Sequence, residues 1–544
     1  MISVPDLLFP EPQRRLDARA LREALTFAFA TGGTSESFTK IWERAEFGPS
    51  DFSSDCFARE LFLGDFVTRC LSFNIAGQKY VPERGHLQRL IAHPPRDLRV
   101  TEFRHEILRE LTDVPERAEE LGRLAAKIRG LVQRLEAPDR GKRYDAIGRR
   151  IDILRSLREL LDELSTAFTG AGAGLARIRQ FALEQRRLPA YDILVNLLDH
   201  ESDRATIDLR VKVGYDGELR SFQIVRAGEN QENPFYRTRF ARLLTKITLW
   251  IQGYGFREAE LLGRLTNAAF DGVQDCVISL FQLLVDMEFY LASLSLRQLA
   301  QNNGLEMCLP EFKSEAEAQS QLEALFNPFL LLEERPPKSA NIAAGERALV
   351  VITGPNSGGK TRLLQALALA QLLGQSGSFV PARRAALEVR HGLFVSLSHE
   401  ASSDQREGRL GTELLRIRRM FEELRFGSLV ILDELCSGTN PSEGEEIFEL
   451  VVSLLAELEP QAFITTHFLQ FASRLEMERP VSRLEFLQVE LDAQENPTYG
   501  FVPGVATTSL AERTAERLGV TREALRVLVD RAKQQKPGVS KWLK

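Results

Sequence analysis

A glycine-rich loop between an apolar strand and a helix constrains the fold of this chain more than any other feature. Residues 350–353 are apolar or β-branched, residues 354–359 form the loop, and a helical pattern opens at Lys360-Thr361. The string satisfies G-x-x-x-x-G-K-[ST] in the strand–loop–helix context that this motif requires. Glycines let successive backbone N–H groups turn towards a phosphate, and the N-terminus of the helix adds positive potential. The sequence therefore predicts an α/β P-loop domain that binds ATP or GTP.

The residues of this loop have distinct expected tasks. Lys360 is expected to reach the β- and γ-phosphates, and the hydroxyl of Thr361 is expected to ligate Mg²⁺. The residues predicted to bind the nucleotide phosphates are Gly354, Pro355, Asn356, Ser357, Gly358, Gly359, Lys360 and Thr361.

A second strand pattern, 73 residues after Lys360, predicts hydrolysis of the nucleotide. Residues 429–432 are apolar and end in Asp433 and Glu434. The C-terminal ends of strands in a parallel sheet face the bound nucleotide. Asp433 suits a role at Mg²⁺ and Glu434 suits the polarisation of an attacking water, since phosphoryl transfer depends mainly on positioning and charge stabilisation. An acidic pair after a strand is weak evidence by itself, and its spacing from the loop makes it strong.

Length and composition restrict the remaining possibilities. A chain of 544 residues is long enough for two to four domains. Five cysteines without C-x-x-C spacing indicate reduced thiols and a cytoplasmic protein. We expect no membrane span, because no run of about 18 apolar residues stands out. The net charge of −6 means that any nucleic-acid contact must come from a local basic surface.

Hydrophobic periodicity predicts a mostly helical region before the P-loop domain. Apolar residues recur at helical spacing in 121–135 and 147–168, with a breaker at 136–141, so we predict a long antiparallel helical hairpin. Strand alternation on both sides of Asp216-Gly217 predicts a β hairpin. The predicted divisions are residues 1–60 of unassigned role, a helical core and lever at 61–320 with the β insertion at about 205–228, the P-loop domain at 321–510, and a helical segment with a basic tail at 511–544.

The helical hairpin is the candidate nucleic-acid surface. Residues 121–158 carry eleven Lys and Arg against four acidic residues, with Arg140, Lys142 and Arg143 near the tip. Such groups would contact phosphates in a salt-dependent way that is insensitive to sequence. A solvated helix face explains most charge runs of this kind, and the two interpretations stay equally open.

The motifs together resemble the MutS family of DNA mismatch-repair ATPases. The loop reads T-G-P-N-S-G-G-K at 353–360, the acidic strand continues as D-E-L-C-S-G-T-N at 433–440, and T-T-H follows at 465–467. The resemblance extends weakly from about residue 65 to residue 530. It implies an ABC-type ATPase domain on an all-α core with a small β insertion. Because it starts so early in the chain, we expect no mismatch-recognition or connector domain.

The resemblance also implies roles for matching residues. MutS proteins are dimeric ATPases, so a homodimer with ATP and Mg²⁺ at the subunit interface is implied. Thr361 and Asp433 would support Mg²⁺, Glu434 would hold the water, and His467 would sense the γ-phosphate. An imidazole at the end of a strand can hydrogen-bond a terminal phosphate oxygen. Asn440 would lie near the partner subunit.

Three departures from the family pattern limit this transfer: an altered trans-acting signature, Arg362 where MutS proteins usually have a second small hydroxyl residue, and the expected lack of the mismatch-recognition and connector domains. The trans-acting signature usually has Ser-Thr after Gly-Arg, whereas here Gly408-Arg409 is followed by Leu-Gly-Thr412. Either Thr412 supplies the hydroxyl to the partner's γ-phosphate or that contact is absent. The Phe-x-Glu string of MutS mismatch reading occurs at Phe9, Phe256 and Phe421, and we interpret all three occurrences as chance.

Three functions remain compatible with the sequence. The first is a homodimeric, ATP-dependent clamp on branched or distorted DNA. The second is an ATP-dependent clamp on RNA or stalled ribosomes. The third is a scaffold that binds ATP and hydrolyses it weakly because of the altered signature at 410–412.

Overall fold

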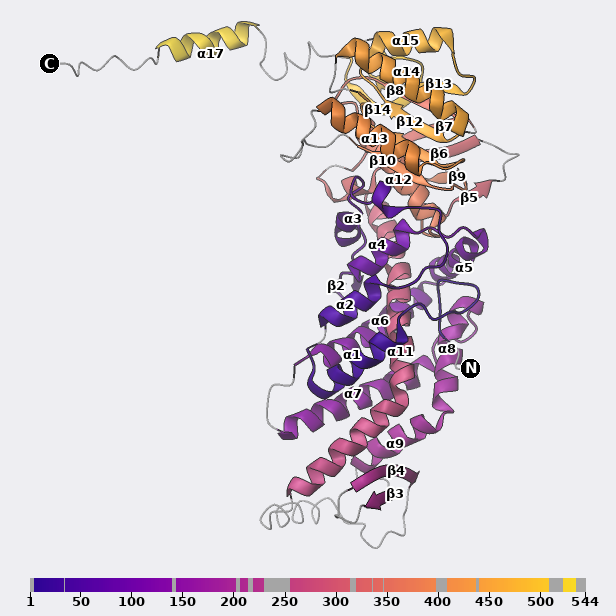
Figure 1. The fold of residues 1–544 in the computed structure, drawn as a ribbon, viewed down its shortest axis with the longest axis vertical. Coiled ribbons are helices and arrows are strands. Elements are labelled where there is room, and N and C mark those ends of the chain that lie inside the picture. The colour runs from indigo at the N-terminus through magenta and orange to yellow at the C-terminus, as the bar shows by residue number, and fades with distance from the viewer. Residues whose placement is uncertain are drawn as a thin grey trace, which may run out of the picture. The chain divides into compact units, whose positions relative to one another are not determined.

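The structure is a computed structural model, and its elements fall into two units that are described separately. It describes residues 4–33, 35–138, 143–201, 206–213, 219–228, 255–313, 319–334, 336–345, 347–397, 409–436, 440–507 and 522–534. The helical unit consists of Met1–Ser54, Phe62–Leu309 and Leu372–Val380. The sheet unit consists of Asp55–Leu61, Pro310–Gln371 and Pro381–Lys544. Figure 1 labels the elements of both units.

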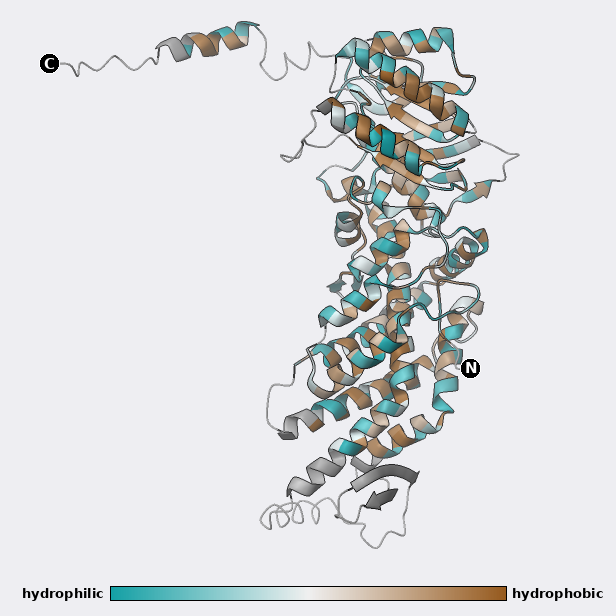
Figure 2. Ribbon diagram, viewed as in Figure 1, coloured by the Kyte–Doolittle hydropathy of each residue, from teal (hydrophilic) through white to brown (hydrophobic). Residues whose placement is uncertain are grey.

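The helical unit is built around one long helix, α11 (Gly255–Asn302). Helices α1, α6, α7 and α9 all contact α11 (Figure 1). The shorter helices of this unit are α1 (Ala18–Thr31), α2 (Ser35–Glu43), α3 (Leu63–Cys70), α4 (Arg84–Ala92), α5 (Leu98–Asp113), α6 (Pro115–Glu136), α7 (Arg143–Leu164), α8 (Ala173–Arg186) and α9 (Pro189–Glu201). Their teal and brown faces in Figure 2 are typical of amphipathic helices that pack against a shared core.

Helix α11 contains an apolar run of the length that we expected to be absent from the sequence. Its portion Gly263–Asn302 contains an 18-residue window with a mean hydropathy of 1.5, which is long and apolar enough to cross a membrane. That window is 94% buried inside the protein. A helix that is apolar on all sides is also what the centre of a helical core requires, and its burial fits that role.

The predicted helical hairpin is present as α6 and α7, which contact each other. Helix α6 begins at Pro115, a residue favoured at the first helical position because its missing N–H would have no partner there. The apolar stripe of α6 is buried, from Leu121 to Leu135. Helix α7 ends at Leu164, earlier than the stripe suggested, and Phe168 adopts a left-handed φ of 52° while staying 3% exposed.

Two small hairpins accompany the helices. Strands β3 (Thr206–Val213) and β4 (Leu219–Gly228) pair antiparallel, which confirms the predicted β insertion. Its turn at Asp216-Gly217 lies outside the described residues. Strands β1 (Phe73–Ile75) and β2 (Gln78–Tyr80) form a second hairpin that the sequence did not suggest.

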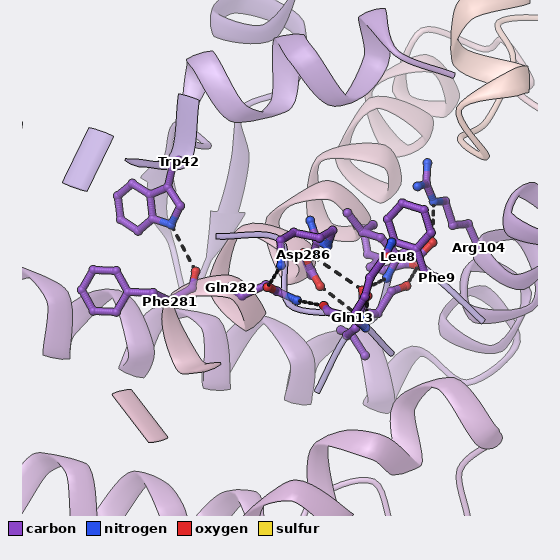
Figure 3. Close-up of polar contacts among 12 residues, drawn as sticks. Leu8, Phe9, Gln13, Trp42, Arg104, Phe281, Gln282 and Asp286 are labelled. Carbon is purple, nitrogen blue, oxygen red and sulfur yellow. Dashed lines mark hydrogen bonds and ion pairs between the residues drawn. The ribbon is translucent and has the colours of Figure 1, made fainter. Parts of the chain in front are cut away.

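Residues 4–16 form an irregular strap that is hydrogen-bonded to α11 (Figure 3). Asp286 of α11 accepts the N–H of Leu7 at its Oδ2, 3.1 Å away, and forms an ion pair with Arg15. The Arg15 N–H donates to Gln282 Oε1 at 2.8 Å. Asp286 and Arg15 are both buried, so each charge depends on the other. The strap is thus an integral part of the helical core.

Phe9 of the strap is the first residue of one Phe-x-Glu string, and it is buried. Its side chain is 8% exposed, and the guanidinium of Arg104 lies 5.4 Å from the ring centroid. Arg104 also donates from Nε to the carbonyl of Leu8 at 3.0 Å (Figure 3). Phe9 is therefore a packing residue of the helical unit.

The sheet unit contains a six-stranded sheet of order β10-β11-β12-β8-β13-β14. All neighbouring strands pair parallel except β13 and β14, which are antiparallel. The strands are β8 (Leu349–Thr353), β10 (Leu393–Ser396), β11 (Leu429–Leu432), β12 (Gln461–Thr465), β13 (Leu484–Leu491) and β14 (Pro497–Pro503). Strands β8, β11 and β12 are buried along their whole length, as expected for parallel strands covered on both faces.

The described part of this unit also contains a second sheet and five helices. The second sheet has the order β5-β9-β6-β7, with β5 (Glu311–Lys313), β6 (Gln319–Leu325), β7 (Ala340–Gly345) and β9 (Arg384–Glu388). The helices are α12 (Lys360–Gln375), α13 (Arg409–Glu423), α14 (Pro441–Leu458), α15 (Leu469–Glu478) and α17 (Arg522–Gln534). The predicted fold class, an α/β P-loop domain plus a helical domain with a β insertion, is confirmed.

Asp55–Leu61 joins the sheet unit although it lies far from the unit in sequence. Glu60 accepts the N–H of Leu397 at 3.2 Å, and Arg419 of α13 donates to the carbonyl of Asp55 at 3.3 Å. The thiol of Cys56 donates to the carboxylate of Glu423. This segment therefore packs against the C-terminal end of α13.

Helix α12 starts in the sheet unit, and the residues at its C-terminal end belong to the helical unit. It begins at Lys360 in the sheet unit, whereas Leu372–Val380 belongs to the helical unit. The hydroxyl of Thr101 donates to the carbonyl of Gln375 at 3.0 Å, and Arg104 donates from Nη1 to that of Ser376 at 2.8 Å. These donors satisfy carbonyl groups that a helix end leaves without partners.

Candidate functional site

The glycine-rich loop lies between β8 and α12 and packs closely against β13 and β14. Gly354 has a φ of 135° and Gly359 a φ of 87°. Residues that carry a Cβ rarely adopt these backbone conformations. A Cβ on Gly354 would lie 2.6 Å from Val489 Cγ2, and one on Gly358 would lie 2.7 Å from the same atom. A Cβ on Gly359 would lie 3.2 Å from the ring of Tyr499. The β13–β14 pair thus leaves room only for glycines at these positions of the loop.

Lys360 is buried at the first turn of α12, with 4% of its surface exposed. Its ammonium donates to the carbonyls of Gly354 at 2.9 Å and Pro355 at 3.1 Å. Burial lowers the pKa of Lys360, and the carboxylates of Glu434 and Asp433 partly offset this effect. A buried ammonium is stabilised by an anion, so the loop is suited to a phosphate. Asn356 and Ser357 are exposed at the outer turn of the loop.

Asp433 connects the end of β11 to α12 and β12. Its Oδ2 accepts the hydroxyl of Thr361 at 2.5 Å, and its Oδ1 accepts the hydroxyl of Thr465 at 2.6 Å. The two residues expected to support Mg²⁺ are therefore in direct contact. Hydroxyl and carboxylate oxygens are the ligands that Mg²⁺ prefers, and the ion commonly completes its shell with water and substrate phosphates. The residues present fit Mg²⁺ bound together with a nucleotide.

Glu434 follows Asp433 in a left-handed conformation with a φ of 50°. Its N–H donates to the same Thr465 hydroxyl, 2.7 Å away. Thr465 therefore orients the Asp433 carboxylate and the Glu434 backbone with one oxygen. The sequence interpretation missed this role, because threonine is common in strands and carries no signal of its own.

The loop and the polar residues converge because their strands are neighbours. Strand β8 pairs with β12, and β12 pairs with β11, all in parallel. The phosphate loop, His467 and Asp433 therefore follow three adjacent strands at the same edge of the sheet. This edge is where ligands bind in open α/β sheets.

Two of the remaining predicted residues, His467 and Asn440, are exposed. The side chain of His467 is exposed, and its ring centroid lies 4.3 Å from that of Phe468. Asn440 is exposed directly before α14. Thr412 lies in the first turn of α13, and its side chain is outside the described part of the structure, as is Gly408. Among the described contacts, neither His467 nor Asn440 reaches Asp433 or Lys360.

The basic residues of the helical hairpin are largely engaged within the chain. Lys127 and Arg123 approach Glu163 of α7, and Arg129 pairs with the buried Glu288. Arg150 donates to the carbonyl of Ala30 and to Asn267, and Arg149 donates to several backbone carbonyls. Arg140 and Lys142 lie outside the described residues, and Arg143 opens α7 with its side chain undescribed. Arg134, near the end of α6, is exposed.

The P-loop motif and its partners identify a nucleotide site, and comparison with known proteins shows which family this part of the chain resembles. Residues 350–536 match the family MutS domain V. Endonuclease MutS2 of Thermus thermophilus is 35% identical over 178 residues, which cover 33% of this chain and 24% of that protein. The protein of the same name from Thermomicrobium roseum is 33% identical over 201 residues, 36% of this chain and 25% of that protein. That from Streptococcus uberis is 35% identical over 180 residues, 32% and 23% respectively.

The matched region therefore spans about a quarter of the length of these curated relatives. The match covers the phosphate loop, the Asp433-Glu434 pair and His467, which are the elements that the geometry brings to one edge of the sheet. MutS domain V is an ABC-type P-loop ATPase domain. Residues 350–536 of this chain are accordingly an ATPase domain of the MutS family.

Proposed function

We propose that this protein is a MutS-like, ATP-dependent DNA-binding protein of the cytoplasm. It forms a homodimeric clamp on branched or distorted DNA, and ATP hydrolysis drives its conformational change. Its pathway is DNA repair or recombination, and it does not read mismatches through a Phe-x-Glu wedge. The course of α12 is the observation that carries this proposal.

Helix α12 offers a direct route from nucleotide to helical unit. Its first residue is Lys360 of the phosphate loop, and the residues that follow its third turn, from Leu372 onward, belong to the helical unit. A packed helix moves as a rigid rod, because protein interiors are close-packed. A shift of the phosphate loop would therefore be carried to the carbonyls held by Thr101 and Arg104.

Exposed groups on α13 and α14 support a nucleotide-bound dimer. Leu414 and Leu415, directly after Thr412 and Glu413, are 43% and 55% exposed. Adjacent exposed leucines offer apolar surface that a second subunit would bury. Asn440 is exposed at the start of α14. In the proposed dimer these residues face the ATP that is held by the other subunit.

The relatives and the helical hairpin support a nucleic-acid ligand. The relatives carry the name Endonuclease MutS2, which describes enzymes that cut nucleic acids. Arg134 provides an exposed charge in the described part of the hairpin. The proposal concerns binding, and it assigns no nuclease activity to this chain.

Fluorescence anisotropy with homoduplex, mismatched, forked and four-way DNA tests the ligand. Each DNA is titrated with no nucleotide, with ADP, and with ATP on the Glu434→Gln variant, at several salt concentrations. We expect the forked or four-way DNA to bind most tightly, with an affinity that falls as salt rises. Arg134→Ala should lower the salt slope by about 1, as loss of one phosphate contact does. Arg99→Ala, at an exposed arginine of α5 (82% exposed), is the matched control and should bind normally.

Absence of binding to every DNA in every nucleotide state would reject the DNA clamp. Co-sedimentation with ribosomes that is lost in Lys360→Ala would support the RNA or ribosome clamp in its place. Steady-state hydrolysis no faster than that of Glu434→Gln would support the weakly hydrolysing scaffold, because the water-polarising carboxylate should contribute orders of magnitude in rate.

A further inference from the structure

The turn after β11 contains two non-glycine residues in left-handed conformations. Glu434 has a φ of 50° and Cys436 a φ of 63°. A left-handed backbone is unfavourable for a residue with a side chain, and such residues persist where surrounding contacts hold them. The candidate water-binding carboxylate therefore sits in a turn that depends on external support.

Two side chains supply that support, one for each left-handed residue. Thr465 accepts the N–H of Glu434 at 2.7 Å, as described above. Glu413 Oε1 accepts the N–H of Cys436 at 2.8 Å. The first support comes from the sheet, whereas the second comes from the helix α13.

The thiol of Cys436 is not suited to a catalytic role in this turn. It is buried, and burial raises the pKa of its thiol to about 12, with the Glu413 carboxylate adding to this rise. A thiol with such a pKa stays protonated and is a poor nucleophile. What Cys436 contributes is its backbone N–H, and Glu413 is the group that binds it.

Glu413 follows Thr412 directly on α13, so one of the two supports of the turn that carries Glu434 is attached to the candidate trans-acting segment. We propose that Glu413 is a positioning residue for ATP hydrolysis. Because it binds the Cys436 N–H, Glu413 couples the position of α13 to the placement of the Glu434 carboxylate. Engagement of Thr412 by the partner's nucleotide would then reset the catalytic glutamate of the same subunit. This coupling across subunits rests on the proposed dimer, whereas the positioning role within one chain does not.

The packing beneath α13 leaves room for such a shift. A cavity of about 40 Å³ lies between α13 and the strands β10 and β11. Glu413, Arg416 and Met420 line it from the helix, and Asp433 and Leu435 line it from the turn. This cavity is a local gap in an interior that is otherwise close-packed, so it is the place where a small movement of α13 would meet least resistance.

Three single variants test the positioning role. Glu413→Ala removes the acceptor of the Cys436 N–H, and Glu413→Gln keeps an acceptor oxygen at the same place. The matched control is Glu422→Ala, which removes an exposed glutamate (57% exposed) from the same helix. We expect Glu413→Ala to lower kcat about tenfold to a hundredfold, the effect of a small misplacement of a catalytic group. Its KM and its affinity for a non-hydrolysable ATP analogue should stay within about twofold of wild type, and Glu413→Gln should recover most of kcat.

A double-mutant cycle with Glu434→Gln distinguishes positioning from a general structural effect. Rates are measured in single turnovers with excess protein. If Glu413 acts through Glu434, then Glu413→Ala should lower the rate in the wild-type background and hardly at all in the Glu434→Gln background. Thermal melts of each variant exclude unfolding as the cause.

An unchanged kcat in Glu413→Ala, a kcat in Glu413→Gln as low as that of Glu413→Ala, or equal losses in both backgrounds would each overturn the proposal. Sedimentation of Glu434→Gln with ATP tests the dimer separately. A monomer in that experiment would reject the proposed clamp and leave the positioning role to be decided by the kcat data.

Discussion

Thr465 offers the most direct test of how the catalytic edge is built. Thr465→Val keeps the shape of the side chain and removes the hydroxyl that contacts Asp433 Oδ1 at 2.6 Å and Glu434 N at 2.7 Å. The first contact is a hydrogen bond to a carboxylate, which contributes about 1.5–3 kcal/mol. The second leaves a part-buried N–H without its partner, at a cost of about 1–3 kcal/mol. The substitution therefore weakens the site by about 2.5–6 kcal/mol before any relaxation.

Relaxation of the turn is expected to convert part of this energy into misplacement of both carboxylates. We expect kcat of Thr465→Val to fall about a hundredfold, which corresponds to about 2.7 kcal/mol of lost transition-state stabilisation. The Mg²⁺ concentration for half-maximal activity should rise, because Asp433 loses one of the two hydroxyls that orient it. Affinity for ATP in the absence of hydrolysis should change little, since Lys360 and the glycine loop remain intact.

Steady-state kinetics over a range of ATP and Mg²⁺ concentrations measures these effects. Thr465→Ser is the matched control, because it keeps the hydroxyl, and its kcat should stay within about threefold of wild type. A kcat of Thr465→Val within twofold of that of Thr465→Ser would refute the reasoning. It would mean that neither carboxylate depends on the Thr465 hydroxyl.

Three further predictions concern stability and assembly. Burial and the nearby Glu288 carboxylate raise the pKa of Glu83 to about 7, so the contribution of Glu83 to stability is present below about pH 4.5 and is lost as pH rises through 7. In urea titrations, Glu83→Gln should therefore stabilise the helical unit by about 2 kcal/mol at pH 8 and by little at pH 5. An equal effect at the two pH values would contradict the pKa shift. Phe9→Ala should destabilise the helical unit by about 3 kcal/mol in the same titrations. It should leave the affinity for mismatched DNA relative to homoduplex unchanged. A selective loss of mismatch binding would show that the Phe-x-Glu string at Phe9 reads DNA. When added to Glu434→Gln, Leu415→Glu should prevent sedimentation as a dimer with ATP. The control Met477→Glu, at an exposed residue (79% exposed) of α15, should leave the dimer intact. Dimers of both double variants would exclude this face of α13 from the interface.

The sequence predicted those parts of the fold that have a strong local signal. The stripe from Leu121 to Leu135 identifies α6 because every third or fourth residue faces the core. The P-loop identifies β8 and α12 because glycines, Lys360 and Thr361 are each required by one local geometry. Strand alternation identified β3 and β4 in the same way.

The parts that sequence reasoning left unassigned are held by contacts between distant residues. Residues 4–16 have no periodicity, and they are ordered by Asp286, more than 260 residues away in the chain. Leu372–Val380 and Asp55–Leu61 each belong to the unit that is more distant in sequence for the same reason. Such pairings depend on the whole folded chain, which single-sequence patterns do not report.

At the site, the sequence identified groups that could react and missed the groups that hold them. Lys360, Thr361 and Asp433 occur in motifs whose spacing states their chemistry. Thr465 and Glu413 are ordinary residues of a strand and a helix, and only their contacts with the turn after β11 reveal their importance. Supporting residues of this type vary with the local backbone and have no fixed motif.

The interleaving of the two units restricts how this protein can be dissected. A fragment from residue 310 to the C-terminus would lack Asp55–Leu61 and would leave Leu372–Val380 without the residues that bury it. The carbonyls of Gln375 and Ser376 would lose Thr101 and Arg104 as donors. Expression of such an isolated domain should yield aggregation-prone material whose enzymology misrepresents the intact molecule, so truncation is a poor substitute for point substitution in studying this enzyme.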